Sequence, residues 1–357
     1  MELYSRRIHA LQKKIRDLCD AFLITDRINI FYLTGSDFEN AWILLLKNKK
    51  NGYLFTDKRF ITESKKQRLL KSFFCNISGR YDKINTLLKS TKKAKLGFEN
   101  TIQFNVFYEL QASLKKTVSL IKCNQLIENQ RTVKDDYEIS QIKKAIKIAL
   151  KTHLYAKKKV KEIVSAGLKI TEKQFASLLS AFMLQEGADE IAFKPIVASG
   201  ERSMDPHAVP GDTIIHKGKI LLIDIGASVN GYKSDLTRTY FVGRINPLYN
   251  MRHLLIKSAL NLALKKIKVG IPIYLVDQEV RKFLAKHGYE KYFLHSAGHG
   301  VGLEVHEKPT LTSKNSDILC ENMILAIEPG IYINGWGGIR LEEMVIVKKE
   351  RAILLSN

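Results

Sequence analysis

The chain has 357 residues, of which 45% are hydrophobic and 26% are charged. This composition is typical of a folded globular protein and excludes a chain that is disordered throughout. At roughly 150 residues per domain, the length predicts two domains. The net charge is +22, with 58 Lys and Arg against 36 Asp and Glu. The lysines are scattered and form no single tract, so we interpret them as a solvated surface, not as a nucleic-acid site.

The cysteines and the N-terminal segment bear on the cellular compartment. The four cysteines lie far apart and form no CxxC pair; they are Cys19, Cys75, Cys123 and Cys320. This spacing favours neither a zinc site nor a disulfide framework and indicates free thiols in a reducing compartment. Residues 1–16 alternate apolar and basic side chains, unlike a signal peptide, and no apolar run reaches the roughly 18 residues of a membrane span. We therefore expect a cytoplasmic protein without a membrane segment.

Residues 1–125 are predicted to form an α/β domain, because strand-like apolar runs alternate there with amphipathic helical stretches. The expected elements are helices over 3–18 and 57–70 and strands over 21–25, 42–46, 52–56 and 96–99. No catalytic set of side chains is recognised in this region.

Residues 135–357 are predicted to form a second domain that opens with a long amphipathic helix over 135–164. A second helix is expected from Thr171 to Gln185, because Gln174 completes a capping box with Thr171. The later expected elements are strands over 220–224, 232–242, 323–327 and 344–347 and helices over 251–265 and 275–286.

Two aspartates stand in strand-forming sequence of the second domain. Asp224 ends an apolar run, where a carboxylate is costly unless it pairs with a cation or binds a metal. Asp235 follows the turn-forming pair Asn230-Gly231, and a hairpin around this turn would bring both aspartates to the same end. The alternative for this segment is an ion pair with a nearby basic residue, either Arg238 or Lys233.

Histidines gather around a glycine-rich segment further on. His299 lies between Gly298 and Gly300, and glycines allow the backbone to approach a ligand closely. His295 and His306 are near neighbours in the sequence. The HExxH spacing of zincins is absent, so these histidines indicate an ion or ligand site of another kind.

Two more carboxylates follow in strand-like sequence. Glu328 ends the apolar run before Pro329, and Glu342 stands in Arg340-Leu341-Glu342. Strand alternation predicts that Arg340 and Glu342 share one face, with Leu341 on the other. Four carboxylates that meet in one pocket repel one another strongly unless cations lie between them. Oxygen-rich ligation with one imidazole suits Mn, Co or Zn, and two such ions can activate a water for attack on a carbonyl.

These residues resemble the five motifs of the pita-bread metallopeptidases, in their family order. The motifs lie at 224–227, 232–239, 298–307, 327–332 and 338–342. Within that group the chain resembles the Xaa-Pro peptidases, aminopeptidase P and prolidase. Segments 24–35 and 56–59 are similar to the creatinase-type amino-terminal domain. The resemblance implies an α+β fold, with a pita-bread catalytic domain at 135–357 preceded by a creatinase-type α/β domain at 1–125.

The resemblance also implies a ligand set. Asp224 would bind one metal ion and His299 and Glu328 the other, while Asp235 and Glu342 would bridge both.

Catalytic and substrate-binding roles follow from the same resemblance. Glu328 would act as general base and then general acid, His207 would lie near the substrate, and His306 would hydrogen bond the scissile carbonyl. The substrate pocket would contain His295, Arg340 and Tyr332. Three positions depart from the family pattern: Ala208 stands where a Gly is usual, Gly211 where a Ser is usual, and Glu343 where an Asp is common. All three lie outside the ligand set and bear on substrate preference.

The implied function is hydrolysis of the Xaa-Pro bond at the N-terminus of short peptides, with two divalent metal ions, Mn first and Co or Zn as alternatives. An Xaa-Pro dipeptidase is the alternative, and a catalytically silent pita-bread binding protein is a remote one. The amino-terminal domain disfavours a methionine aminopeptidase, and the metal ligands disfavour creatinase. The expected partners are peptides with proline at the second position and a second copy of the chain in a homodimer.

Overall fold

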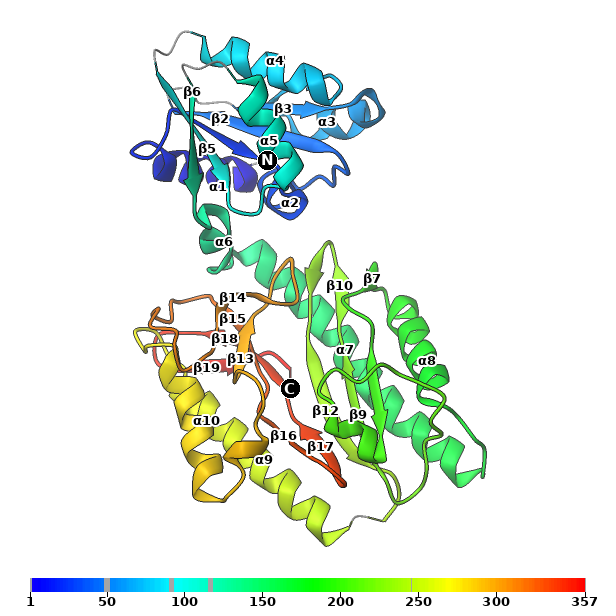
Figure 1. Cartoon of the computed structure of the whole chain (residues 1–357). Coiled ribbons are helices and arrows are strands. Elements are labelled where there is room, and N and C mark those ends of the chain that lie inside the picture. The colour runs from blue at the N-terminus through cyan, green and yellow to red at the C-terminus, as the bar shows by residue number, and fades with distance from the viewer. Residues whose placement is uncertain (1, 48–51, 90–92, 115–117, 245, 357) are drawn as a thin grey trace. The chain divides into compact units, whose positions relative to one another are not determined.

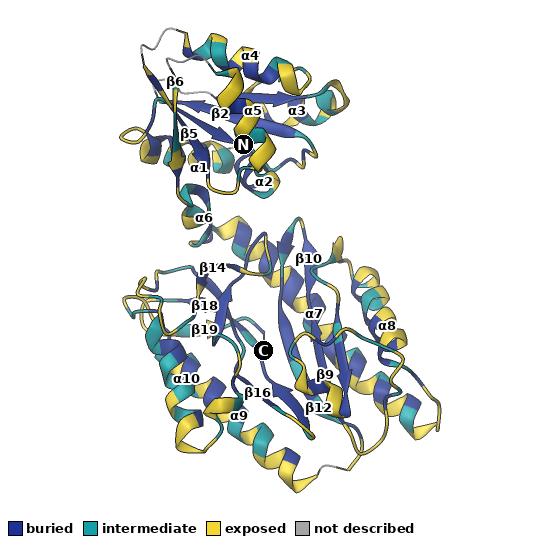
Figure 2. Cartoon of the chain, viewed as in Figure 1, coloured by how far each residue is buried: buried dark blue, intermediate teal, exposed yellow. Residues whose placement is uncertain are grey.

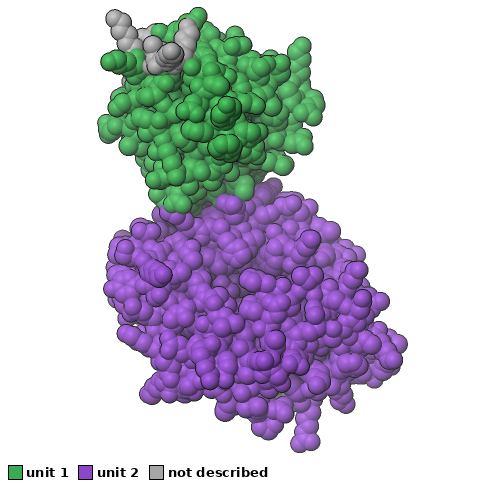
Figure 3. All heavy atoms as spheres, in the orientation of Figure 1, with its two compact units in different colours: residues 1–131 green, residues 132–357 purple. Residues whose placement is uncertain are grey.

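The computed structural model describes residues 2–47, 52–89, 93–114, 118–244 and 246–356. The chain divides into two compact units, Met1–Arg131 and Thr132–Asn357 (Figure 3). We refer to them as the amino-terminal unit and the catalytic unit. Within the described ranges, no helix combines the length and the apolar character that crossing a membrane requires.

The amino-terminal unit is built on one mixed sheet of six strands in the order β4-β3-β2-β1-β5-β6. The strands are β1 (Ala21–Ile24), β2 (Ala41–Leu46), β3 (Tyr53–Thr56), β4 (Lys71–Phe74), β5 (Ala94–Glu99) and β6 (Val118–Cys123). The helices are α1 (Glu2–Ile15), α2 (Arg27–Thr34), α3 (Ile61–Gln67), α4 (Ile77–Leu88), α5 (Phe104–Ser113) and α6 (Leu126–Arg131). Strands β1 and β2 are buried along their whole length, as expected for apolar strands covered on both faces. The predicted α/β class is confirmed.

Some elements of this unit differ from the sequence-based expectation. The helix predicted over 57–70 is a short 3-10 turn, η1 (Lys58–Phe60), followed by the seven-residue α3. The interruption begins at Asp57, whose carboxylate accepts a hydrogen bond from the backbone N–H of Arg59 at 2.9 Å. Strand β4 was not predicted, because it lies at the sheet edge and carries little of the apolar pattern of a central strand.

The helices of the catalytic unit begin where the capping residues predict. Helix α7 (Asp136–Ser165) starts with a capping box between Asp135 and Glu138, and α8 (Glu172–Gln185) starts with the predicted box of Thr171 and Gln174. The others are α9 (Pro247–Lys266), α10 (Tyr274–Lys286) and the 3-10 turns η2 (Gly200–Met204) and η3 (Glu290–Tyr292). Figure 1 shows the strands of this unit between α7 and α8 on one side and α9 and α10 on the other.

Every strand pairing in the described catalytic unit is antiparallel, and so are its isolated bridges. The sheets have the orders β12-β9-β8, β14-β13-β15-β18-β19, β11-β10-β7 and β16-β17. The strands are β7 (Glu190–Ile191), β8 (Ile196–Ser199), β9 (Ile220–Ile225), β10 (Ala227–Val229), β11 (Tyr232–Lys233), β12 (Leu236–Phe241), β13 (Gly298–Gly300), β14 (Glu307–Thr310), β15 (Ile324–Ile327), β16 (Gly330–Ile333), β17 (Gly337–Arg340), β18 (Glu343–Val347) and β19 (Ala352–Leu354). This helix-backed antiparallel arrangement confirms the predicted α+β pita-bread class.

Two apolar clusters stabilise the catalytic unit. One joins α9 and α10 to the strands near the C-terminus, with Ile256, Val280 and Leu325 fully buried. The other joins α7 and α8 to β8 through β10, with Phe175 and Leu221 at its centre. Figure 2 shows buried residues along the strands and exposed residues on the outer faces of the helices. The two clusters fix two sets of strands whose polar ends carry the predicted ligands.

Two predicted strands are broken at residues of the candidate site. The strand expected over 232–242 changes partner, because β11 pairs with β10 whereas β12 pairs with β9. Asp235 lies in this break. The single strand predicted through Arg340-Leu341-Glu342 is interrupted, since β17 ends at Arg340 and β18 begins at Glu343. The predicted facing is confirmed, because Arg340 and Glu342 both hydrogen bond to Thr237 while Leu341 packs in the apolar cluster of α9 and α10.

Candidate metal centre

Three carboxylates from separate strands converge in the catalytic unit. Asp224 lies on β9, Asp235 lies between β11 and β12, and Glu342 lies between β17 and β18. Each offers an oxygen, and these oxygens all lie within 4.8 Å of one another. All three residues are buried. The predicted hairpin exists, with Asn230 and Gly231 at positive φ in its turn, as a type I′ turn requires.

His299 and Glu328 lie against the same carboxylates. His299 is the central residue of β13, and its Nε2 atom is 3.5 Å from Asp235 Oδ2 and 3.7 Å from Glu328 Oε1. Glu328 follows directly after β15. The structure therefore brings together all five residues of the predicted ligand set.

Three oxygens of this cluster have no hydrogen-bond partner among the described residues. They are Asp224 Oδ1, Asp235 Oδ1 and Glu342 Oε1, and all are buried. A buried polar atom without a partner costs about 1–3 kcal/mol, and more when it is charged. Burial, together with the charge of neighbouring carboxylates, raises the pKa of Asp235 and Glu342 well above the usual range. Cations between the carboxylates would remove both costs, so these residues fit divalent metal ions.

The tautomer of His299 agrees with a metal ligand. Its Nδ1 atom lies 3.1 Å from the backbone carbonyl of Gly300, which can only accept a hydrogen bond. The proton therefore sits on Nδ1, and the lone pair of Nε2 faces the carboxylates. Burial lowers the pKa of His299 to about 4, so the ring is neutral at pH 7. A neutral imidazole with one N–H anchored on a carbonyl is the usual state of a metal-binding histidine.

The backbone around His299 has no room for side chains. A methyl group on Gly298 would lie 2.0 Å from the carbonyl oxygen of Ala326, and one on Gly300 would lie 2.1 Å from that of Lys308. Strand β13 thus lies close to both β14 and β15. This close packing explains why glycine stands on each side of His299.

Arg340 holds two of the carboxylates in place, Asp224 directly and Glu342 through Thr237. Its guanidinium donates to Asp224 Oδ2 at 2.7 Å and to Thr237 Oγ1 at 2.9 Å. Thr237 in turn donates to Glu342 Oε2 at 2.8 Å. The alternative ion pairs considered for Asp224 and Asp235 are wrong, because the two basic side chains concerned pair with other carboxylates: Arg238 with Glu343 and Lys233 with Glu190.

A second chain of hydrogen bonds runs from Arg340 to His295. Arg340 donates to the hydroxyl of Tyr332 at 2.8 Å, and that oxygen lies 2.9 Å from His295 Nε2. His295 Nδ1 lies 2.8 Å from the backbone carbonyl of Ser296, so Nδ1 carries the proton and Nε2 accepts from Tyr332. Burial lowers the pKa of His295 to about 4. The three predicted substrate-pocket residues form one connected group.

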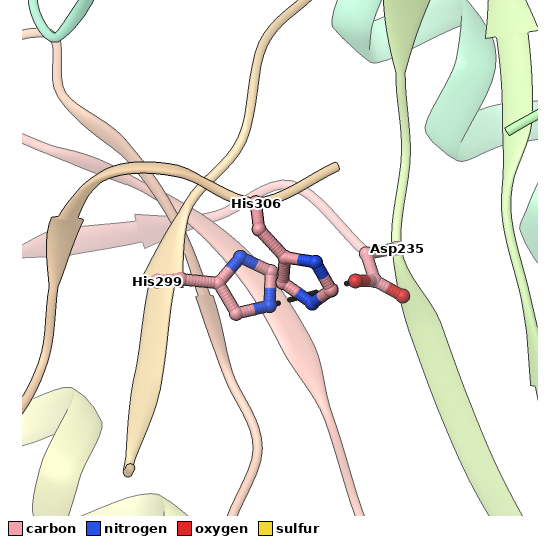
Figure 4. A group of neighbouring side chains, drawn as sticks. All are labelled: Asp235, His299 and His306. Atoms are coloured by element: carbon pink, nitrogen blue, oxygen red, sulfur yellow. Dashed lines mark ion pairs between the residues drawn. The ribbon is translucent and has the colours of Figure 1, made fainter. Parts of the chain in front are cut away.

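The two remaining histidines lie at the edge of the cluster. His306 is exposed, and its ring centroid is 4.3 Å from that of His299. Figure 4 shows the two rings side by side and, as a dashed line, the 3.5 Å approach of His299 Nε2 to Asp235 Oδ2. A nitrogen of His306 also lies within 4.8 Å of ligand atoms of Asp235 and His299. His207 is exposed in the turn after η2. The pKa values of His295 and His306 are lowered first by the burial of their own rings and, to a smaller extent, by the neighbouring His207.

Sequence reasoning missed two supports of the site. One is Thr237, which links Arg340 to Glu342. The other is the buried ion pair of Lys134 and Glu307, 3.2 Å apart. Glu307 also accepts hydrogen bonds from the backbone N–H groups of Leu303 and Glu304, and so orders the segment before His306. The position of Glu307 directly after His306 was the available signal.

Residues 140–349 match Metallopeptidase family M24, and residues 7–133 match the Creatinase/Prolidase N-terminal domain. The chain belongs to metallopeptidase family M24. Curated relatives of this M24 peptidase include an Xaa-Pro dipeptidase of Pyrococcus furiosus, 31% identical over 94% of this chain and 93% of the relative. A putative Xaa-Pro aminopeptidase of Mycoplasma genitalium is 32% identical over 98% of both chains.

Solved structures of both kinds resemble this M24 peptidase over nearly its whole length. An X-Pro aminopeptidase from Thermotoga maritima superposes with a TM-score of 0.86 at 31% identity and 97% coverage of both chains. An Xaa-Pro dipeptidase from Bacillus anthracis has a TM-score of 0.90 at 28% identity, covering 99% of this chain and 98% of the other. The predicted resemblance to the Xaa-Pro branch of pita-bread metallopeptidases is confirmed.

Proposed function

We propose that this M24 peptidase is an Xaa-Pro aminopeptidase that hydrolyses the bond before proline at the N-terminus of short peptides with two divalent metal ions. The main support is the five-residue cluster, in which three buried carboxylate oxygens lack a partner within the described residues. When ionised, the four carboxylates of the cluster carry more negative charge than one divalent ion and the paired Arg340 can balance together.

The ligands divide between the two ions. Asp224 would bind one ion and His299 and Glu328 the other, with Asp235 and Glu342 shared between them. Carboxylate oxygens with a single imidazole nitrogen suit Mn, with Co or Zn as alternatives. When bound, the ions would lower the pKa of a water and polarise the scissile carbonyl.

Glu328 is proposed to carry the proton. Burial raises the pKa of Glu328 to about 7 in the absence of metal, and its carboxylate lies beside the place proposed for the attacking water, where a general base is needed. It would take a proton from the attacking water and deliver it to the proline nitrogen when the peptide bond breaks. Its Oε2 atom lies 4.0 Å from His295 Nδ1, and this distance supports an exchange beside the proposed substrate pocket.

The histidines are proposed to position the substrate and stabilise charge. His306 is exposed at the edge of the cluster, where its N–H could donate to the carbonyl oxygen as negative charge develops. His207 would contact the substrate from the same side. His295 and Tyr332 would line the pocket for the proline ring. Arg340 would act through them and through Asp224, because its three nitrogens are all engaged.

The aminopeptidase assignment rests on the basic groups at the site. A dipeptidase must bind the free carboxylate of its proline residue. The two guanidinium groups that hydrogen bond to ligand residues already pair with carboxylates of the chain, Arg340 with Asp224 and Arg238 with Glu343. This favours a substrate that continues beyond proline, with an amide in place of that carboxylate.

The test compares peptides of equal concentration with the Mn-loaded enzyme. Ala-Pro-Ala should be cleaved faster than the dipeptide Ala-Pro, and Ala-Ala-Ala and Met-Ala-Ser should be cleaved far more slowly. A preference for Ala-Pro would establish the dipeptidase alternative. Similar rates on all four would contradict Xaa-Pro specificity. Chelation should abolish activity, and Mn should restore more than Co or Zn.

Two further proposals concern the cellular compartment and the oligomeric state. The four cysteines are free thiols, in keeping with a cytoplasmic location. A homodimer is proposed from family resemblance, and sedimentation equilibrium at micromolar concentration would test it directly.

A further inference from the structure

A pocket of about 470 Å³ lies in the catalytic unit away from the predicted ligand set. It is lined by the C-terminal half of α7, the end of β12 and the first turns of α9. None of the five predicted metal ligands is among its lining residues. Its volume falls in the range of small-molecule sites.

The charges that line this pocket are all of one sign. Lys157 and Lys161 come from α7, and Lys217 comes from the turn before β9; no lining residue is acidic. Among the described residues, no carboxylate lies within 4.0 Å of any of these three ammonium groups. Neighbouring lysines of α7 differ, since Lys158 and Lys159 both lie near Glu162. Within the described residues, therefore, no ion pair competes with a ligand for the three pocket lysines.

The wall formed by β12 and α9 is aromatic. The rings of Phe241 and Tyr249 have centroids 5.1 Å apart, and those of Tyr249 and His253 are 5.6 Å apart. Val160 and Val242 add buried aliphatic surface. Burial and then Lys257 lower the pKa of His253, so this ring is neutral and adds hydrogen-bonding capacity without charge. A flat apolar group would contact several rings at once.

We propose that this pocket binds an aromatic anion, with the ring system against Phe241, Tyr249 and His253 and the negative group facing Lys157, Lys161 and Lys217. The inference is independent of the peptidase assignment, because it uses none of the residues given a role in catalysis.

The test is calorimetric titration of the metal-loaded protein with naphthalene-2-carboxylate, 2-naphthyl phosphate and the neutral naphthalene-2-carboxamide. At least one anion should bind, roughly tenfold or more tightly than the amide, and its affinity should fall as salt is raised. The tighter of the two anions identifies the preferred head group. Equal binding of the amide, or no binding of either anion, would overturn the proposal.

Variants locate the binding. Replacement of Lys157, Lys161 and Lys217 by Gln should weaken anion binding roughly tenfold or more. The matched control replaces three exposed lysines of the same helix, Lys143, Lys144 and Lys147, which lie roughly 15 Å or more along the helix from Lys157 and Lys161. This control should bind like the wild type. A carboxylate bound at the metal centre would be unaffected in both variants.

A blocking variant separates pocket occupation from general charge. Asn250→Trp places a bulky side chain at an exposed lining position of the pocket and should abolish anion binding while thermal unfolding and peptidase rate stay near wild type. Undiminished binding by this variant, or by the triple Gln variant, would overturn the assignment to this pocket.

Discussion

Glu99 in the amino-terminal unit and Glu342 in the catalytic unit are both almost fully buried glutamates, yet they differ in how many hydrogen bonds their carboxylates accept. Glu99 accepts three hydrogen bonds, from the backbone N–H groups of Thr25 and Asp26 at 2.7 and 2.9 Å and from the side chain of Asn29 at 2.7 Å. Glu342 accepts one, from Thr237, and its second oxygen has no partner among the described residues. Burial alone does not distinguish a structural carboxylate from a ligand.

Hydrogen-bond satisfaction makes that distinction. The bonds of Glu99 tie β5 to the start of α2, and every bond comes from the chain itself. Asp224, Asp235 and Glu342 instead face one another, and each keeps a buried oxygen to which no described residue donates a hydrogen bond. A fold that leaves three such acceptors together is destabilised unless cations bind there. The contrast predicts that equivalent substitutions in the two units have different consequences.

The largest effect is expected for Glu342→Ala. Removing a residue that only orients a ligand typically costs 10- to 100-fold. If Glu342 bridges two ions as proposed, its loss should lower turnover by more than roughly 100-fold and also lower metal content. The matched control is Glu99→Ala, which should lower the unfolding temperature but leave bound metal and turnover per folded chain unchanged. Metal analysis and peptide hydrolysis measure both. A Glu342 variant with two metals and a normal rate would show that Glu342 is not a bridge.

A smaller loss is expected for His306→Ala. If His306 donates a hydrogen bond to developing charge, turnover should fall on the order of 100-fold while metal content stays near normal. A ring nitrogen of His306 also lies within 4.8 Å of ligand atoms of Asp235 and His299, so metal content is the decisive measurement. Loss of one metal ion would place His306 among the ligands and reassign the second ion.

Tyr332→Phe tests the hydrogen-bond chain between Arg340 and His295. Without the hydroxyl, His295 Nε2 and one nitrogen of Arg340 each lose a partner, so we expect a fall of roughly tenfold in kcat/KM with metal content unchanged. The control is Tyr240→Phe, whose hydroxyl lies 3.1 Å from His153 and belongs to no proposed catalytic group. Equal rates for the two variants would contradict a positioning role for Tyr332.

The smallest effect concerns pH and Glu99. Burial raises the pKa of Glu99 to about 7, above the roughly 4.3 of an unfolded glutamate. The folded chain therefore binds more protons between these values, so the stabilisation is complete below the unfolded pKa and is lost as pH rises through 7. Stability of the amino-terminal unit should fall by about 1 kcal/mol between pH 6 and 8.

Urea unfolding followed by Trp42 fluorescence in a Trp336→Phe background would measure this slope, because the chain has only these two tryptophans. Glu99→Gln should flatten the slope between pH 6 and 8. An unchanged slope in this variant would mean that another group controls the pH dependence.

The sequence predicted the candidate site better than its supports. Each residue of the predicted ligand set stands in a short motif with glycines, prolines or a strand end beside it, so local chemistry could point to Asp224, His299 and Glu328. The partner of Asp224 is Arg340, 116 residues away, and no local pattern distinguishes it from Arg238. Partner choice between cations depends on how strands meet, and this is fixed only by tertiary packing.

Fold prediction failed in the same way, where an element depends on distant contacts. Capping boxes at Asp135 and Thr171 are local, and both helices start where expected. The break at Asp235 arises because β11 and β12 pair with different strands, which alternation of apolar residues cannot reveal. The short β4 lacks a strong apolar pattern and forms through pairing with β3 alone.

The two glycines beside His299 limit how this enzyme can change during evolution. Any side chain at Gly298 or Gly300 would collide with a backbone carbonyl of a neighbouring strand, so the imidazole cannot be shifted by single substitutions beside it. Adaptation to a different metal supply would have to alter the carboxylates or their hydrogen-bond partners, such as Thr237. The strand that carries His299 is therefore the part of the centre that tolerates the fewest substitutions.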